Sequence, residues 1–344
     1  MKKLTKCVNC GSGLVYSPAK NAIVCEHCDS IYAMPATKRN VKLLRRYTID
    51  YVPEADTSLQ NVFMCNTCNT THVVAEGKIS TRCPSCGDTN ISKAESRTTF
   101  PDGIIPFKLD KVKAVELFEK WLKKRKFAPN DLLALAKNGK ISKVYVPVYN
   151  INGTSVCAYN GMVKKVHTDD SSGTIFSTVH TVQDVSTSTI ENVALCANSV
   201  VDSDLIEQIV DVDPNKIVPY SSEYLFGYYG ANTNISIHDL LDKLTKDEEK
   251  RREEKVRSKL KDKYDEIVHL TCNTQLRNVS FNYVYVPVFM NHYTYKNKKY
   301  HCYINGTNGK IAGVSPKSAG KILALMGGIA VGIGLLILAV LKFL

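Results

Sequence analysis

The chain has 344 residues, with 45 Lys and Arg against 33 Asp and Glu, a net charge of +12, 44% hydrophobic residues and 12 cysteines. This length and hydrophobic content exclude a disordered tail or a disulfide-held miniprotein, and they allow two or three units with cores of their own. Residues 1–140 carry 23 Lys and Arg against 13 Asp and Glu, so most of the positive charge lies there. Such a basic region favours binding of phosphate groups, but its charge alone does not distinguish nucleic acid from lipid headgroups.

Two copies of one cysteine spacing, C-x2-C-x14-C-x2-C, open the chain. The two sets are Cys7, Cys10, Cys25 and Cys28, then Cys65, Cys68, Cys83 and Cys86. A C-x-x-C turn presents two thiolates, and two such turns complete a tetrahedral zinc site with no open coordination position. Gly11 and Gly87 each follow the second cysteine of a turn, where a positive φ is easily accommodated. The spacing predicts two zinc ribbons, at residues 1–35 and 61–95, each with one structural Zn²⁺.

Alternatives remain open for the C-x-x-C pairs, for the two nearby histidines and for the other cysteines. The C-x-x-C pairs can instead be redox-active or form disulfides, and His27 or His72 can replace a cysteine as ligand. Four further cysteines lie alone in apolar or strand-like stretches: Cys157, Cys196, Cys272 and Cys302. We expect these four to be buried, inert thiols, against a third metal site or paired disulfides.

A basic linker at residues 36–60 separates the two ribbons, and a new unit begins near residue 100. An apolar stripe predicts a helix over residues 111–126 whose last turn is basic, as suits the helix dipole. These two segments supply the candidate phosphate or lipid contacts. They are Lys38, Arg39, Lys42, Arg45, Arg46, Lys123, Lys124, Arg125 and Lys126.

Residues 100–318 read as one mixed α+β domain. Strands are expected at residues 144–149, 154–180, 190–201 and 283–289, with Gly153, Gly161 and Gly173 as turns between the earlier ones. A long helix is expected over about residues 237–269, with Ser236 and Asp239 as a capping box. Its centre is almost wholly charged and offers the i,i+4 pairs Asp247/Arg251, Glu248/Arg252 and Glu253/Arg257, which favour an exposed helix.

The last 23 residues, 322–344, predict a transmembrane tail anchor. The run from Ile322 to Leu341 carries no charge, and twenty residues of helix span about 30 Å, the thickness of a bilayer core. Lysines before this run favour a single-pass protein of the cell membrane whose soluble part is cytoplasmic. Gly328 and Gly332 form G-x-x-x-G, which permits self-association through this helix.

No catalytic motif accompanies these elements. The sequence lacks a G-x-x-x-x-G-K-[ST] loop, a G-x-S-x-G elbow and an H-E-x-x-H helix. The nearest string, Gly306-Thr-Asn-Gly309-Lys310, has the wrong spacing and the character of a hairpin turn. We therefore expect the protein not to be an enzyme.

The chain resembles bacterial tail-anchored proteins with N-terminal zinc ribbons, described as TFIIB-type zinc ribbon-containing or as primosomal protein N′ (replication restart helicase)-like. The matching segments are the paired C-x-x-C sets, residues 105–108, 121–124, 127–130, 145–148, 286–288, 293–296 and 304–310. Where that family often has Pro-Phe-Trp or Pro-Val-Trp, this chain has Val148-Tyr149 and Val288-Phe289. The resemblance implies no enzymatic activity, and it implies SPFH-domain or phage-shock partners in a membrane-stress response. A helicase needs a phosphate-binding loop and motor domains, so that label lacks support.

These observations give a fold of small zinc-ribbon β modules, then a mixed α+β domain, a long charged helix and one C-terminal transmembrane helix. The function hypothesis is a membrane-anchored adaptor that recruits protein partners to the cytoplasmic face of the membrane. The alternative is a nucleic-acid-binding zinc-ribbon protein tethered to the membrane. A third hypothesis docks the basic helix 111–126 on anionic lipid.

Overall fold

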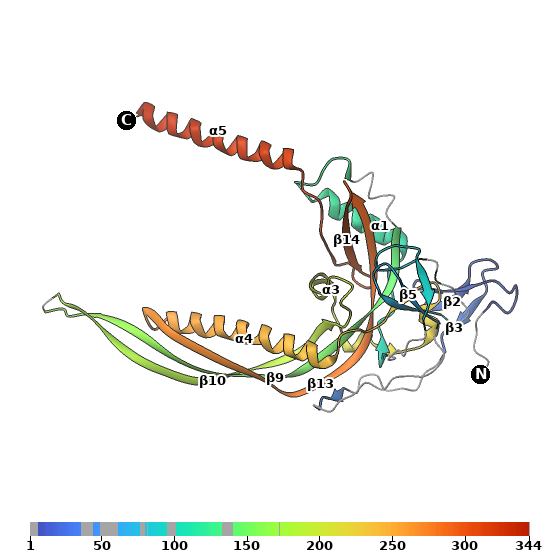
Figure 1. Ribbon diagram of the computed structural model, residues 1–344, viewed down its shortest axis with the longest axis horizontal. Coiled ribbons are helices and arrows are strands. Elements are labelled where there is room, and N and C mark those ends of the chain that lie inside the picture. Colours follow the sequence, from blue (N-terminus) through green and yellow to red (C-terminus); the bar gives the residue numbers. More distant parts are fainter. Residues whose placement is uncertain are drawn as a thin grey trace.

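A computed structural model describes residues 6–35, 44–48, 61–75, 80, 82–94, 101–132, 140–171 and 173–343. The molecule consists of a body, a long curved arm on one side and two small cysteine-bearing lobes at the opposite end (Figure 1). Most of the described strands belong to one 12-stranded sheet, and three others form a separate sheet. The expected fold, two separate ribbons followed by a mixed α+β domain, is therefore wrong, because one large sheet dominates and one cysteine module is part of it.

Three very long strands build the arm and continue into the body. They are β9 (Lys140–Thr168), β10 (Ile175–Cys196) and β13 (Glu266–Tyr295). β9 and β10 form an antiparallel hairpin, and β13 pairs with the other edge of β9 along almost its whole length. The arm is therefore a three-stranded ribbon in the order β10, β9, β13, which extends far beyond the body (Figure 1).

Two glycines expected at turns lie instead inside β9. A Cβ on Gly161 would lie 2.6 Å from the carbonyl oxygen of His269, and one on Gly153 would lie 3.1 Å from that of Arg277. Both glycines thus permit the backbone of β13 to approach β9 closely. This is why two of the predicted strands merge into one, and only Gly173, with a φ of 67°, sits at the hairpin tip.

Short strands complete the body. The central order is β11-β8-β13-β9-β12-β6-β5-β7, while β14 and β15 extend the sheet from β13, and β4 pairs with β13. Their bounds are β4 Arg45–Arg46, β5 Asn61–Cys65, β6 Thr71–Val74, β7 Ile91–Lys93, β8 Gly103–Ile104, β11 Val218–Pro219, β12 Tyr229–Ala231, β14 Lys298–Asn305 and β15 Ile311–Gly313. Because β12 pairs with both β6 and β9, the second cysteine module joins the main sheet. The separate sheet holds β1 (Leu14–Ser17), β2 (Ala22–Cys25) and β3 (Ile31–Ala33) of the first module.

The described helices begin at the residues that capping chemistry predicts. Asp110 caps α1 (Lys111–Lys123), Asp202 caps α3 (Ser203–Ile209) and Ser236 caps α4 (Ile237–Lys261). Single 3₁₀ turns occupy Pro214–Lys216 and Ser222–Leu225, and α5 spans Ala319–Phe343. The helix expected to reach residue 269 ends at Lys261, since the chain turns there and enters β13.

Helix α4 lies along one face of the arm (Figure 1). Its first half packs Leu240, Leu241 and Leu244 into the main core, and its last turns pack Val256 and Leu260 against the arm. The charged centre is not wholly exposed as expected, because Glu248 and Arg252 are 3% and 6% exposed. They face each other with Oε2 and Nε 3.9 Å apart.

An aromatic cluster fills the main core where the arm strands enter the body. Phe107 lies 5.0 Å from Tyr145, 4.8 Å from Tyr228 and 4.9 Å from Phe289, measured between ring centroids. A Cβ on Gly306 would lie 2.4 Å from a ring carbon of Phe107, so the turn after β14 closes directly over this ring. These contacts fix the base of the arm to the rest of the sheet.

Helix α5 corrects the membrane prediction. It projects from the body (Figure 1), and most of its described side chains are exposed. Within the part of the chain that the structure describes, no helix is both long enough and apolar enough to cross a membrane. The predicted anchor over 322–344 relied on side chains 335, 336, 338, 339 and 341–344, which lie outside the described set. The single-pass anchor, the membrane contact through Ile322–Leu341 and the location derived from them are therefore wrong on this finding.

Candidate metal centres

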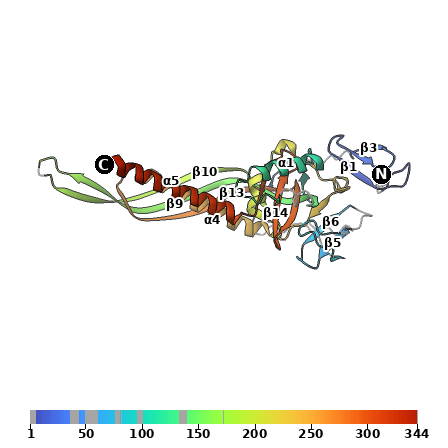
Figure 2. The same ribbon diagram turned by 90° about the horizontal axis from the view of Figure 1, so that it is seen from above.

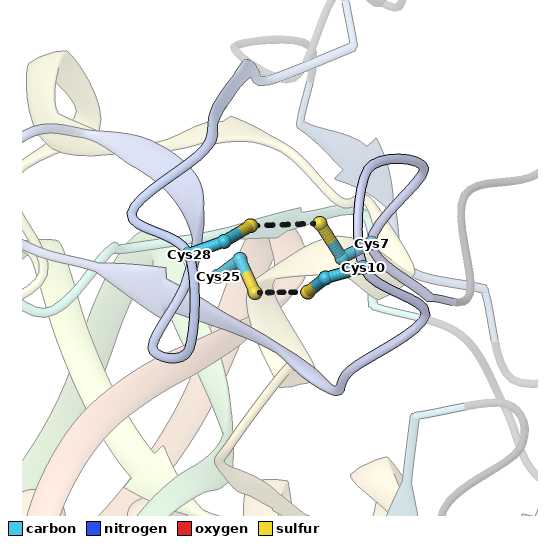
Figure 3. Close-up of side chains that lie close together, drawn as sticks. All are labelled: Cys7, Cys10, Cys25 and Cys28. Carbon is cyan, nitrogen blue, oxygen red and sulfur yellow. Dashed lines mark hydrogen bonds between the residues drawn. The ribbon is translucent and has the colours of Figure 1, made fainter.

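The first cysteine module brings its four predicted ligands together (Figure 3). Cys7 Sγ lies 3.4 Å from Cys28 Sγ, and Cys10 Sγ lies 3.5 Å from Cys25 Sγ. All four sulfur atoms lie within 4.8 Å of one another. One pair comes from the turn before β1 and the other from the turn between β2 and β3, so two turns at the same end of one small sheet supply the set.

The second module repeats this arrangement. Cys65 Sγ lies 3.6 Å from Cys86 Sγ, and Cys68 Sγ lies 3.6 Å from Cys83 Sγ. These four sulfur atoms also lie within 4.8 Å of one another. In both modules the first cysteine is paired with the fourth and the second with the third. The duplicated spacing in the sequence therefore reflects a duplicated site.

The sulfur separations fit a tetrahedral metal ion and exclude disulfides. A Zn–S bond of about 2.3 Å in a tetrahedron places neighbouring sulfur atoms about 3.8 Å apart. A disulfide needs about 2.05 Å. All eight cysteines carry free thiols, so the disulfide alternative fails in this state. Two four-thiolate groups that can each hold one metal ion are present, as the sequence predicted.

The backbone of all four C-x-x-C turns has one shape. The residue after the second cysteine has a positive φ in each turn: Gly11 at 71°, Asp29 at 56°, Asn69 at 57° and Gly87 at 78°. Its N–H donates to the carbonyl of the first cysteine, at 2.9 Å for Gly11 and 3.0 Å for Asp29. Sequence reasoning found the two glycines only. Asn and Asp are the other residues that adopt this conformation readily, and that preference was the missed signal.

Hydroxyl groups surround the thiolates and were not found from the sequence. Ser30 Oγ and Thr70 Oγ1 each lie 3.0 Å from the sulfur of the cysteine two positions earlier, Cys28 and Cys68. The Tyr32 hydroxyl lies 3.2 Å from Cys7 Sγ and accepts a hydrogen bond from the Val8 N–H at 3.0 Å. These groups donate to thiolates and orient them toward a common centre.

The pKa values of the thiols differ within each module. The Tyr32 hydroxyl lowers the pKa of Cys7 to about 5, and hydrogen bonds from Ser12 lower the pKa of Cys10. Burial raises the pKa of Cys83 well above its ordinary value and raises that of Cys86 to about 11. Each module combines both kinds of thiol, because the pKa of Cys25 is raised to about 11 and that of Cys65 is lowered to about 7. A metal ion must displace the protons of the thiols whose pKa is raised.

Neither histidine near the modules is a ligand. Each four-ligand group consists of cysteines alone among the residues described. His27 is exposed beside its turn. His72 is fully buried, stacks on Phe63 at 6.1 Å and contacts Ser80 Oγ through Nε2 at 2.7 Å. His72 is therefore a packing residue of the second module.

Both modules are fastened to the body by aromatic and backbone contacts. Tyr16 of the first module packs on Tyr224 at 5.0 Å and Tyr228 at 6.0 Å, and its N–H donates to the Phe226 carbonyl at 2.9 Å. The second module is bound through the β6–β12 pairing. The two lobes consequently lie next to each other, on the side of the body away from the arm tip (Figures 1 and 2).

The candidate basic residues lie in three different settings. Lys38, Arg39 and Lys42 lie outside the described residues. Arg45 forms an ion pair with Asp102, and Arg46 belongs to the short strand β4 beside β13. The exposed group at the end of α1 is intact and comprises Lys123, Lys124, Arg125 and Lys126. Within it, the Arg125 guanidinium lies 4.4 Å from the centre of the Trp121 ring.

The other four cysteines form no metal group with the described side chains. Cys157, Cys196 and Cys302 are buried, Cys272 is half-buried, and all four are free thiols. Burial raises the pKa of Cys196 and of Cys272 to about 12 in each case, which leaves them protonated and unreactive. This agrees with the expectation of inert thiols.

Comparison with known proteins gives one informative relative. The chain is 24% identical over 344 residues to the uncharacterized protein YdjG of Bacillus subtilis (strain 168). The alignment covers 95% of this chain and 94% of that protein, so the sequence similarity extends over nearly the full length of both. No family model matches the chain, and no solved structure matches it.

Proposed function

We propose that the protein is a non-catalytic scaffold in which two structural zinc ions hold two β modules in place for binding a partner protein. The closed four-thiolate sets carry this proposal. A set of four protein ligands leaves no position for water or substrate, which is the arrangement of a structural and not a catalytic zinc ion. Thiolates in a tetrahedron also favour zinc over magnesium or calcium, which prefer oxygen ligands.

The first module offers the partner surface. Val8, inside its first turn, is 75% exposed, and Ile31, on β3, is 57% exposed. Both belong to the same small module, in which the Val8 N–H donates to the hydroxyl of Tyr32, the residue after Ile31. Single exposed apolar residues are common, but here two of them lie on one small module that a metal ion would hold rigid. We infer that they fit an apolar groove on a folded partner protein.

Metal content is the first test. The full chain purified without chelator should contain two zinc ions, measured by elemental mass spectrometry. Cys10→Ser and Cys68→Ser should each lower the content by about one ion. A second transition metal in place of zinc, or no bound metal in a folded chain, would contradict the zinc assignment.

Partner capture is the second test. The variant Val8→Asp/Ile31→Asp should keep both zinc ions and lose one specific crosslinked partner that the wild type retains. Val112→Asp is the matched control, because Val112 on α1 is 69% exposed and lies outside the module. The scaffold proposal is wrong if capture is unchanged in the double variant. Salt-dependent binding of a labelled DNA or RNA oligonucleotide, abolished by reversing the charges at the end of α1, would favour the nucleic-acid alternative.

A further inference from the structure

The outer edge of β10 is a long strand edge without a partner among the described strands. β10 pairs with β9 and with no other strand that the structure describes. From Ile175 to Ile190 its register with β9 is unbroken, and the first irregularity lies between Ile190 and Val193. A strand of this length presents about 50 Å of edge. Such an edge is a template for pairing with another chain.

The backbone of β10 is oriented for that pairing. In β9, the Lys164 carbonyl and the Val166 N–H both bond to Asp265 on the β13 side. Even-numbered β9 residues therefore point their backbone groups to β13, and odd-numbered ones point theirs to β10. Each odd residue of β9 pairs with an even residue of β10, as Val163 does with His180. It follows that the odd residues of β10 direct their N–H and C=O groups to the free edge. One of them, the Val185 N–H, donates to Asp184 Oδ1 at 2.7 Å in the single chain, so pairing with another strand must replace this bond.

This edge has fewer protective features than the other side of the arm. Between Ile175 and Ile190 the only Asp, Glu, Lys or Arg is Asp184, and there is no proline. The arm portion of β13, by contrast, has two register shifts and carries Glu266 and Arg277. Charges and bulges are the usual means of blocking a strand edge. Of the two described edges of the arm, that of β10 is therefore the more suitable for association.

The sequence of β10 is complementary to itself in one register. We propose that a second copy of this chain pairs antiparallel with β10 about a two-fold axis at Val182, the midpoint of residues 175–189. His180 then faces Asp184 of the other copy, twice, on the face of the arm that bears α4. Val179 faces Val185, twice, on the opposite face, and these valines are 54% and 57% exposed in the single chain. Moving the axis by one residue in either direction places both His180 and Val179 opposite other residue types.

The resulting assembly is a six-stranded arm shared by two chains. Its length is set by the hairpin tip at one end and by the irregularity after Ile190 at the other. Both copies of α4 lie on the same face, because the axis is perpendicular to the sheet. The proposal is independent of the metal sites and of the partner surface on the first module.

A cysteine trap tests the register in the full, zinc-loaded chain. Val182→Cys places two cysteines across the axis, at a non-hydrogen-bonded pair with Cα atoms about 4.5 Å apart, which suits a disulfide. We expect mild oxidation to give a disulfide-linked dimer joined through residue 182, identified by mass spectrometry and well above the wild-type background. Val179→Cys alone should not crosslink, since its two copies lie about 20 Å apart. A mixture of Val179→Cys with Val185→Cys should. Crosslinking at 182 no greater than in the wild type would overturn the proposal.

An edge-blocking variant tests the assembly itself. Thr181→Pro removes an N–H on the free edge and leaves the ladder with β9 intact, so the single chain should keep its circular dichroism spectrum. Sedimentation velocity should then show loss of the dimer, while Thr181→Val, the matched control, stays dimeric. A folded Thr181→Pro variant that remains a dimer would locate the contact elsewhere, for example at the G-x-x-x-G of α5, and would reject the β10 interface.

Discussion

At the scale of single residues, hydroxyl groups lie beside the thiolates of both modules, where we expect them to strengthen metal binding. Tyr32 is the clearest case, because its hydroxyl contacts Cys7 Sγ at 3.2 Å and is itself held by the Val8 N–H. The spacing of the cysteines fixes which atoms ligate. The hydroxyl groups fix their orientation and favour the thiolate form.

Tyr32→Phe should therefore weaken metal binding at the first module by about 10- to 100-fold and leave the second module unchanged. Competition with a chromophoric chelator measures both sites. Tyr16→Phe is the control, because Tyr16 belongs to the same module but its hydroxyl donates to Asn21 at 2.9 Å, away from the sulfur atoms. Equal affinity in the Tyr32 and Tyr16 variants would show that the hydroxyl has no effect on the metal.

At the scale of elements, the buried charges of α4 determine how this helix rests on the arm. Glu248 pairs with Arg252, and it also accepts a hydrogen bond from Arg251. Arg252 reaches across to the arm, where its Nη1 lies 3.3 Å from Ser186 Oγ. This polar contact to β10 lies midway along the helix. Apolar contacts flank it on both sides, made by the leucines of the first half and by Val256 and Leu260 near the end.

Glu248→Leu should lower the free energy of unfolding by about 3–5 kcal/mol, because it leaves the buried Arg252 charge without its partner. The double variant Glu248→Leu/Arg252→Leu should be less destabilised than this single variant, since an apolar pair removes the desolvation cost of both charges. Urea unfolding monitored by circular dichroism measures the wild type, Glu248→Leu, Arg252→Leu and the double variant. A double variant as unstable as the sum of the two single ones would contradict a coupled buried pair.

At the scale of the whole molecule, buried neutral histidines link stability to pH. Burial lowers the pKa of His292, on β13, to about 4. Unfolding returns this histidine to a pKa near 6.5, so the unfolded chain binds more protons between these values. The stabilisation is fully present above about pH 6.5 and is lost as the pH falls toward 4.

His292→Gln should flatten the dependence of the unfolding free energy on pH in this window, by at most about 3 kcal/mol between pH 6.5 and 4. The measurement is urea unfolding at several pH values. Because acid also displaces metal from thiolates, metal content is measured at each pH, and both proteins are compared only where it is equal. An unchanged slope in the variant would mean that His292 is protonated in the folded chain as easily as in the unfolded one.

Both four-cysteine groups, and the starts of α1 and α4, followed from the sequence because they depend on residues a few positions apart. A C-x-x-C turn or an Asp or Ser cap carries its own geometry. Boundaries that depend on distant residues did not follow. The glycines of β9 look like turn residues, and only the approach of β13, more than 100 residues away along the chain, shows their purpose.

The sequence by itself determined the two four-cysteine groups and the cap of α4, since each is a short-range property. Only the tertiary structure decided that the second module joins the main sheet, that three strands form one arm, and that two charges of α4 are buried. It also corrected the membrane span. The physical reason is the range of the interactions. Strand pairing and burial depend on contacts between residues far apart in the chain, and local sequence patterns do not predict such contacts.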